Sequence, residues 1–403
     1  MNNRFWFIAY LVLVILMSFY TIKLNIGFEV RISQIYLLII FLLILLYELR
    51  YKVFNLRLYS FFLLSGILLS LISLNSAFEK IGEFKFIIKY VVIFPAAFYV
   101  GYRAIYLVGI RNIIKISEIA ILLATSLAIF LYYYPIKFLI HDRGALTGLQ
   151  GTFWESAGLS IYVSIFLLIS LILRIYYNNI TKKIFYLYAI AFVIIILTKT
   201  KIVYIAFLTL IIIAVIYKLN FIIKSNFLNN FALNFIRKVN IKKIALFTGM
   251  FLFILYTYNQ YEPFITEEII KDKIENERGR ALKVSFDLLE KSNWLGAYGF
   301  GFVERYFSGI YRGENIIGLG EGINAIFNSF LDIWIAVGLF GVIFQIIILV
   351  MAFGKKHFLN IAIPVFLFLV GLTGPVFIDF NYYLFLGLSY GFKKYMENKV
   401  ENV

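Results

Sequence analysis

Cysteine is absent from this chain of 403 residues, and histidine occurs only twice, as His141 and His357. Without cysteine there is no disulfide, no thiol chemistry and no thiolate metal site. Two histidines leave little room for a histidine-rich metal centre. We therefore expect no metal site in this chain.

Charged residues are also scarce, at 15% of the chain, whereas hydrophobic residues make up 62% and aromatic residues 19%. Repeated apolar runs of membrane-spanning length predict an all-α polytopic membrane protein. The first run has no small-residue cleavage site after it, so we interpret it as a retained span rather than a signal peptide. The net charge of +16 is more simply explained by loops that face anionic lipid headgroups than by nucleic acid binding.

The apolar runs predict twelve transmembrane helices. They lie near residues 5–22, 32–47, 58–74, 86–101, 113–134, 159–175, 184–198, 202–217, 244–259, 326–350, 359–374 and 376–392. Only Lys199, Thr200 and Lys201 separate the seventh run from the eighth, so one long kinked helix is the alternative there.

Lysine and arginine are unevenly shared between the loops on the two sides of these helices. With the N-terminus inside, most of them fall in cytoplasmic segments, as the positive-inside rule requires. The strongest marker is 218–243, which contains six basic residues and no acidic one. Both termini are therefore predicted to be cytoplasmic. The expected parts are 1–259 with nine helices, 260–325 as a large periplasmic loop, and 326–403 with three helices and a cytoplasmic tail.

The segment 260–325 is long, hydrophilic and holds half of the chain's acidic residues. It is the one place where we expect a folded subdomain outside the membrane. Its charges over 267–277 alternate in sign at i,i+4 spacing, which favours a solvated helix over a carboxylate metal site. Leu282, Phe286 and Leu289 then share one stripe, which predicts an amphipathic helix that lies on the membrane or caps the bundle.

Four segments resemble motifs of the O-antigen polymerase/ligase superfamily, in the family's order. RGALTGLQGTFWESAGL (143–159) resembles an outer-loop motif, and LTKTKIVYIAF (197–207) resembles the "TxSRxxxL" segment. GRALKVSFDLLEKSNWLGAYGFG (279–301) has the arginine, the amphipathic helix and the glycine-rich strip of the family's long outer loop. FNSFLDIWIAVGLFG (327–341) resembles "HNxxLxxxxExGLxG".

The resemblance implies a GT-C-like fold and the activity of a Wzy-type polymerase in the bacterial inner (plasma) membrane. Such an enzyme joins oligosaccharide repeat units carried on polyprenyl diphosphate, on the periplasmic face, into O-antigen or a related surface polysaccharide. A hydroxyl of one unit attacks the anomeric carbon of another, which inverts as polyprenyl diphosphate leaves. No cofactor is implied, because the diphosphate is both carrier and leaving group. A chain-length regulator is a candidate partner, besides the bilayer itself.

Fixed cations are expected to stabilise the departing diphosphate. By the resemblance these are Arg143, Lys201 and Arg280, with Arg278 as the register alternative, and they should converge on one periplasmic pocket. Asn328 is expected to contact diphosphate or sugar. For two of these residues a structural role is the alternative to diphosphate binding. Arg143 could form an interfacial ion pair, and Lys201 could anchor a short outer turn.

Two departures from the family pattern bear on the reaction. Phe327 stands where the ligases have a histidine, and Ala336 stands where the family has a glutamate. Phenylalanine cannot accept a proton, which favours polymerase over ligase. The remaining candidates for a general base are Glu155 and Asp332. A place in the interfacial aromatic belt is the alternative for Glu155.

The segment 327–341 opens with polar groups although an apolar run begins there. Asn328 and Ser329 are suited to capping a helix at the bilayer surface. We favour a polar lining of an outer cavity, because Asp332 lies one turn deeper than capping needs. Gly338 and Gly341 would then allow close packing on a neighbouring helix.

A lipid-linked oligosaccharide flippase or another transporter is the alternative from a different class. Transporters usually have repeat-related halves and broken helices at the midplane. We find no duplication in this chain, and the few midspan charges give little support to a proton relay.

Overall fold

The computed structural model describes residues 3–19, 22–25, 29–51, 54–74, 80–134, 136, 151–153, 156–177, 179, 181–225, 277–302, 328–354, 357–374 and 376–401. The α-helices are α1 (Asn3–Ser18), α2 (Ile32–Tyr51), α3 (Leu56–Leu74), α4 (Lys80–Ile88), α5 (Phe94–Val108), α6 (Ile110–Tyr133), α7 (Ser156–Tyr176), α8 (Lys182–Leu197), α9 (Lys201–Ser225), α13 (Glu277–Lys291), α15 (Ser329–Val337), α16 (Leu339–Ala352), α17 (Leu359–Gly371) and α18 (Phe380–Glu401). The short elements are the strands β1 (Lys23–Asn25) and β2 (Glu29–Arg31), the π-helix η1 (Lys89–Ile93) and the 3-10 helix η2 (Val376–Ile378).

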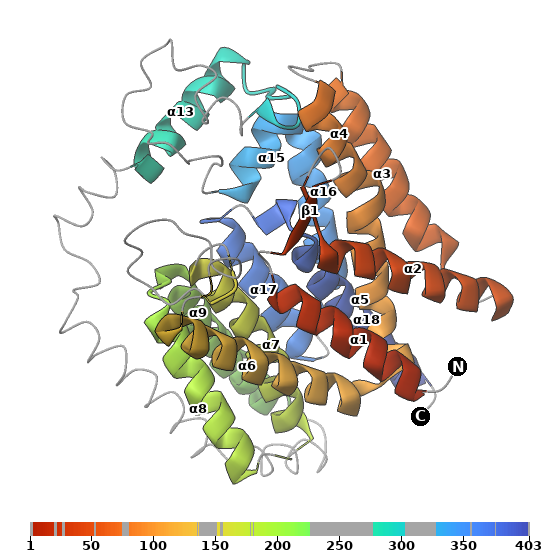
Figure 1. The fold of residues 1–403 in the computed structure, drawn as a ribbon, viewed down its shortest axis with the longest axis vertical. Helices are drawn as coiled ribbons and strands as arrows, with labels where there is room; N and C mark the ends of the chain where they lie inside the picture. The colour runs from red at the N-terminus through yellow and green to blue at the C-terminus, as the bar shows by residue number, and fades with distance from the viewer. Residues whose placement is uncertain are drawn as a thin grey trace.

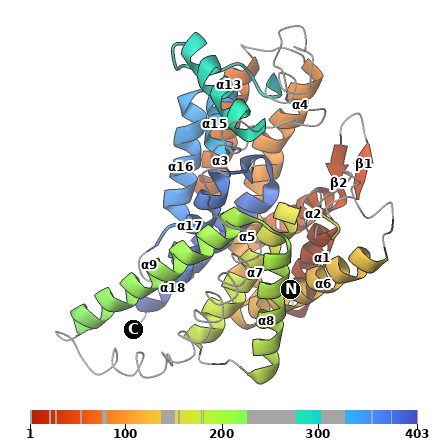
Figure 2. The same ribbon diagram turned by 90° about the vertical axis from the view of Figure 1, so that its left-hand side faces the viewer.

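The helices form one bundle around a continuous apolar core that reaches from α1 to α18. α13 lies at one end of the bundle, beside α15, and α8 extends toward the opposite end (Figures 1 and 2). The β1–β2 hairpin is antiparallel, with Lys23 opposite Arg31. The start of α1 and the end of α18 both lie in the half of the molecule away from α13.

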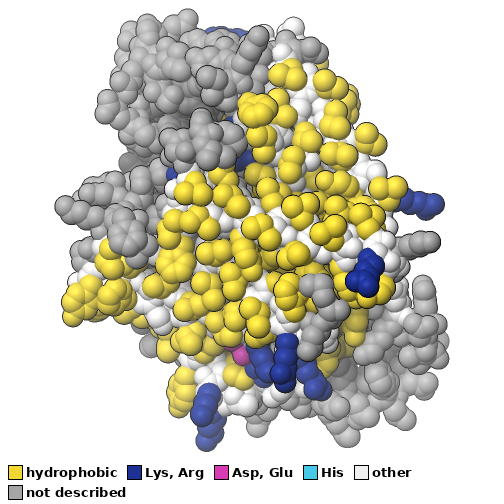
Figure 3. Space-filling view, turned by 45° about the vertical axis from the view of Figure 1, so that its right-hand side comes forward, with side chains coloured by type: hydrophobic (Ala, Val, Ile, Leu, Met, Phe, Trp, Pro, Cys, Tyr) yellow, Lys and Arg dark blue, Asp and Glu magenta, His cyan; other side chains and the backbone are white. Residues whose placement is uncertain are grey.

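Within the described ranges, five helical runs are long and apolar enough to cross a membrane: α2, α3, α6, α7 and the run Phe84–Val108 through α4, η1 and α5. α1, α16, α17 and the first part of α9 are shorter apolar helices. Large apolar side chains on the bundle surface are exposed, and both Leu46 and Leu64 reach 65%. Figure 3 shows such side chains over most of one face, with a group of Lys and Arg at its lower edge. The prediction of an all-α membrane protein agrees with this architecture, and the number of spans stays a prediction.

The predicted apolar runs coincide with helices wherever the structure describes them, and the run at 244–259 lies outside the described residues. The run at 326–350 is not one helix, because Gly338 adopts φ 73° and separates α15 from α16. The run at 86–101 belongs to a longer helix that contains η1. The alternative of a single kinked helix over α8 and α9 is wrong, because Lys199 turns the chain with φ 54°.

α5 and α18 approach each other closely because glycine stands on both helices where they meet. A Cβ atom added at Gly387 would lie 2.1 Å from the Phe98 carbonyl oxygen, and one at Gly391 would lie 2.3 Å from that of Tyr102. One at Gly101 would lie 2.0 Å from the α18 backbone. The neighbours advance in the same order along both helices, so α5 and α18 run parallel. Small residues allow this backbone contact between helices in lipid.

Ion pairs join helices in the bundle. Arg103 pairs with Glu48, whose carboxylate also accepts a hydrogen bond from the Tyr99 hydroxyl. Arg174 binds Glu118 through two parallel contacts, Nε to Oε1 at 2.7 Å and Nη2 to Oε2 at 2.9 Å. These carboxylates are engaged in holding helices together, which assigns them a structural role rather than a place in a proton relay.

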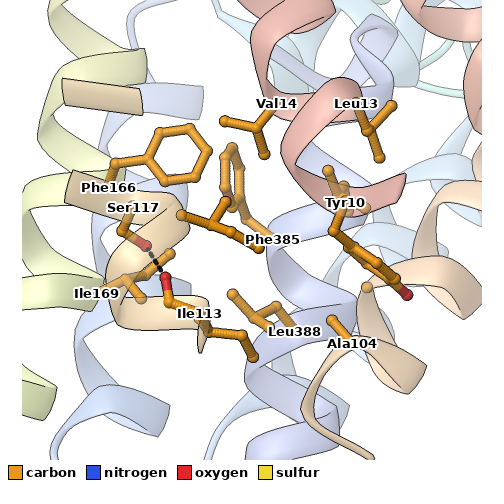
Figure 4. Close-up of a pocket in the computed structure, with 13 residues that line it drawn as sticks. Tyr10, Leu13, Val14, Ala104, Ile113, Ser117, Phe166, Ile169, Phe385 and Leu388 are labelled. Atoms are coloured by element: carbon orange, nitrogen blue, oxygen red, sulfur yellow. Dashed lines mark hydrogen bonds between the residues drawn. The ribbon is translucent and has the colours of Figure 1, made fainter. Parts of the chain in front are cut away.

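A small apolar cavity lies in the core between α1, α5, α6, α7 and α18 (Figure 4). Its volume is about 50 Å³. The Ser117 hydroxyl in its wall donates to the Ile113 carbonyl at 2.9 Å, and the Tyr10 hydroxyl donates to the Val100 carbonyl at 2.6 Å. With the polar groups of its wall already bonded, the cavity suits neither a charged diphosphate nor a sugar.

Candidate functional site beside α13 and α15

The first turn of α15 is fixed by two of the polar residues that the sequence singled out. Asn328 is the N-cap: its Oδ1 accepts from the backbone N–H groups two and three positions later, at 3.0 and 3.1 Å. The Ser329 hydroxyl donates to the Gly374 carbonyl and accepts from the Val376 N–H at 2.7 Å. Asn328 and Ser329 therefore have the capping and tethering roles that competed with ligand binding. Contact of Asn328 with a substrate stays a prediction.

The other end of α15 is closed by the glycine-rich strip (Trp294–Gly301). A helix leaves the carbonyl groups of its last turn without intrahelical partners. The N–H groups of Tyr298 and Gly299 donate to the Ile335 and Ala336 carbonyls, each at 2.8 Å. The strip thus satisfies carbonyls that the break in the helix leaves open.

Glycine is needed for this approach. Gly296 has φ 67°, and a Cβ atom there would lie 2.1 Å from the Trp334 carbonyl oxygen. At the break itself, a Cβ atom on Gly338 would lie 2.8 Å from the Leu295 carbonyl oxygen. The backbone that the strip approaches so closely is therefore that of α15. Gly341 of α16 likewise packs closely against α15, where the nearest atoms belong to Ile333 and Val337.

α13 packs on α15 through a face that differs from the predicted stripe. Leu282 and Phe286 are exposed, and Leu289 alone of that stripe is buried. Over 281–291, the part of α13 whose side chains are described, the buried residues are Ala281, Ser285, Leu288 and Leu289. Ala281, Leu288 and Leu289 meet Leu331 and Ile335 of α15 in a separate small core. α13 therefore caps the bundle, which is one of its two predicted roles, through a face other than the stripe. Contact of Leu282 and Phe286 with the membrane stays a prediction.

The strip also reaches η1 and α3. The Phe300 ring stacks between Phe86 and Tyr90, with centroids 5.6 and 4.6 Å away and planes within 19° and 16° of parallel. The Phe300 N–H donates to the Ser73 hydroxyl at 2.7 Å. Asp332 of α15 is close enough to Tyr90 to interact with it electrostatically. The strip, α15 and a π-helix therefore meet near Asp332, and π-helical turns are frequent at functional sites.

Three cations near this end were not singled out by the sequence. The ammonium groups of Lys85 and Lys89 lie 5.5 and 5.1 Å from the centroid of the Phe86 ring. Arg31 joins the hairpin to the start of α18 by an ion pair with Asp379, Nη1 to Oδ2 at 2.9 Å. The sequence did contain a sign of the two lysines: Lys85 and Lys89 are four residues apart, with Phe86 between them, so they lie on one helix face.

The predicted site residues are described to different extents. Lys201 is the first residue of α9 and is partly exposed. Arg278 and Arg280 belong to the first turn of α13, where the structure describes only the backbone. Arg143 and Glu155 lie outside the described residues. The convergence of these cations on one pocket stays a prediction.

In the part of the chain that the structure describes, no group of three His, Asp or Glu residues stands where it could hold a metal ion. No protein-family model matches the chain, and no curated protein sequence matches it. The resemblance therefore rests on the four sequence segments and on how the described ones pack.

Proposed function

We propose that this protein polymerises oligosaccharide repeat units carried on polyprenyl diphosphate, by inverting glycosyl transfer on the periplasmic face of the bacterial inner membrane. One observation supports the proposal most directly. Two segments of the resemblance, 279–301 and 327–341, are separate in sequence and form one hydrogen-bonded unit in space. A chance likeness in two unrelated loops gives no reason for them to pack together.

The position of this unit fits a periplasmic site. It lies at the end of the bundle that carries α13, whereas a group of Lys and Arg side chains gathers at the other end of the apolar face (Figure 3). Basic residues favour the cytoplasmic side. We therefore propose twelve spans in a GT-C-like bundle, with both termini in the cytoplasm and α13 in the periplasm.

The proposed step is a single displacement. The hydroxyl oxygen of the acceptor sugar bonds to the anomeric carbon of the donor, and the bond from that carbon to the diphosphate oxygen breaks. The hydroxyl proton passes to a carboxylate, and the bonding electrons leave with polyprenyl diphosphate. Asp332 is our first candidate for that base because it is partly exposed beside η1, and Glu155 is the second. Arg143, Lys201, Arg278 and Arg280 are the proposed cations for the leaving group, and Asn328 the proposed sugar or diphosphate contact.

The broken helix favours a transferase over a flippase. In transporters, the free ends of discontinuous helices bind substrates and ions. In this chain Asn328 occupies the start of α15, and the glycine-rich strip occupies its end. Both helix ends are therefore engaged by the protein itself. A ligase of the same superfamily remains the second candidate, with Phe327 in the histidine position against it.

The test expresses the gene beside its own repeat-unit synthesis genes and separates the surface glycan on a gel. Asp332→Asn and Arg280→Ala should remove the ladder of long chains, by roughly 10²–10⁴-fold in rate for a lost general base. Single repeat units should persist. The matched controls Asp287→Asn and Lys283→Ala change exposed charges of α13 and should keep the ladder.

Three other results would change the assignment. A normal ladder in both site variants would remove the proposed roles of these residues. Loss of single units as well would indicate a flippase. Long chains that accumulate on the lipid carrier and never reach the surface glycolipid would indicate a ligase.

A further inference from the structure

The surface of α13 divides into three sectors. At about 100° per residue, the buried side chains occupy one side of the helix. Next to them come Leu282 and Phe286, which are apolar and exposed. The remaining sector carries the charges Lys283, Asp287, Glu290 and Lys291, all exposed. The exposed apolar sector thus lies between the bundle and the charged sector.

The turn after α13 extends this apolar sector. Trp294 and Leu295 are 48% and 70% exposed, whereas Leu282 and Phe286 are 41% and 42% exposed. The Phe286 and Trp294 ring centroids lie 6.3 Å apart. Trp334 fixes the position of Trp294, because its indole Nε1 donates to the Trp294 carbonyl at 3.0 Å. We call Leu282, Phe286, Trp294 and Leu295 the α13 patch.

The α13 patch continues onto the apolar surface of α16. The Leu295 carbonyl lies against Gly338, where α16 begins. Leu339 and Phe340 follow at once and are 48% and 60% exposed. α16 is one of the apolar helices of the bundle, and its outward side chains face lipid if the bundle is embedded. The patch is therefore the outer continuation of a lipid-facing surface.

We propose that the α13 patch is inserted into the interfacial layer of the bilayer, with the charged sector of α13 in water. Tryptophan and phenylalanine beside a charged helix face are typical of segments that lie in this layer. α13 thereby docks on two surfaces at once: α15 through its buried face and the lipid headgroup region through the patch. This fixes the depth of its first turn, with Arg278 and Arg280. Contact of these arginines with the diphosphate of a lipid-linked sugar rests on the proposed function. The docking of α13 on the membrane does not depend on that function.

The absence of cysteine allows a direct test by single-cysteine variants in nanodiscs that hold one copy of the protein. Phe286→Cys and Leu295→Cys probe the patch, and Lys283→Cys and Glu290→Cys probe the charged sector. Ser285→Cys, a nearly isosteric change at a fully buried position, is the buried reference. Each is reacted with a membrane-impermeant maleimide. In parallel, each exposed position carries a nitroxide whose relaxation by oxygen and by an aqueous nickel complex is compared.

The patch cysteines should react about tenfold or more slowly than Lys283→Cys and Glu290→Cys, as expected for side chains that rarely meet water. Their nitroxides should be relaxed more by oxygen than by nickel, because oxygen concentrates in lipid. Fast labelling at both patch positions would overturn the proposal. Slow labelling of the patch cysteines would also overturn the proposal if their nitroxides were not relaxed by oxygen, because protein rather than lipid would then cover the patch. Protection that appears only at high protein-to-lipid ratio would identify a second copy as the occupant instead.

Discussion

Replacement of Gly296 by alanine tests whether the glycine-rich strip is held to α15 by close backbone contact. The new Cβ atom would stand 2.1 Å from the Trp334 carbonyl oxygen, so the strip and α15 must move apart. An L residue at φ 67° also costs about 1–2 kcal/mol. Loss of the two hydrogen bonds from Tyr298 and Gly299 costs about 1 kcal/mol each. The strip should therefore be destabilised locally by about 3–4 kcal/mol.

Amide hydrogen exchange measured by mass spectrometry reads this local effect. Peptides that contain Tyr298 and Gly299 should exchange roughly 10²–10³-fold faster in Gly296→Ala, since about 1.4 kcal/mol corresponds to a factor of ten. Peptides from α5 and α18 should be unchanged. Ala297→Gly is the matched control: Ala297 has φ 62°, so glycine there relieves strain and should leave exchange unchanged or slower.

Two outcomes would refute the reasoning. Exchange of the strip at the parent rate in Gly296→Ala would mean that backbone contact does not hold it on α15. Equal acceleration in the α5 and α18 peptides would mean that the whole bundle, and not the strip, responds to the change.

Three further predictions concern the bundle. Gly387→Val should keep α18 from reaching α5, so that monodisperse protein is not recovered on size-exclusion chromatography. Gly374→Ala is the control and should be tolerated, because the atom nearest to its new Cβ, the Val370 carbonyl oxygen, lies 3.6 Å away. Burial lowers the pKa of His357 to about 4 from its usual 6.5. Between pH 6.5 and 4 the His357 imidazole therefore stays neutral in the native state but gains a proton in the unfolded state. The contribution of His357 to stability is complete above pH 6.5, and the free energy of unfolding should fall by about 3 kcal/mol as the pH drops to 4. Thermal unfolding near pH 7 and pH 4 checks this, and His357→Gln should reduce the difference. Arg174→Leu should cost about 3 kcal/mol because it leaves the Glu118 carboxylate without a cation, although the Ser170 hydroxyl still donates to it. The double variant with Glu118→Leu should recover most of that loss in the same assay.

The positions of the helices could be predicted from sequence because a long apolar run determines a membrane helix almost by itself. The run at 58–74 became α3 (Leu56–Leu74), and the run at 159–175 became α7 (Ser156–Tyr176). The break at Gly338 could not be predicted in this way, because the apolar run continues across it. That break depends on the docked glycine-rich strip, and hence on tertiary contacts.

The face of α13 and the surroundings of Asp332 show a second limit. An apolar stripe on a helix beside a membrane can face the protein or the lipid, so the period of Leu282 and Phe286 did not say which. Tyr90 lies within an apolar run, where an aromatic residue gives no sign that a carboxylate from α15 will interact with it electrostatically. Residue types suited to the reaction could be found from sequence; their neighbours could not.

The parallel pairing of α5 with α18 sets an order of events during biosynthesis. α5 leaves the ribosome early, and the helix whose glycines fit against it is synthesised long afterwards. Until then the glycine face of α5 stays open within the membrane, so the bundle closes only in a late step. A ribosome that stalls between the two helices would leave a half-assembled bundle exposed to the quality-control proteases of the membrane.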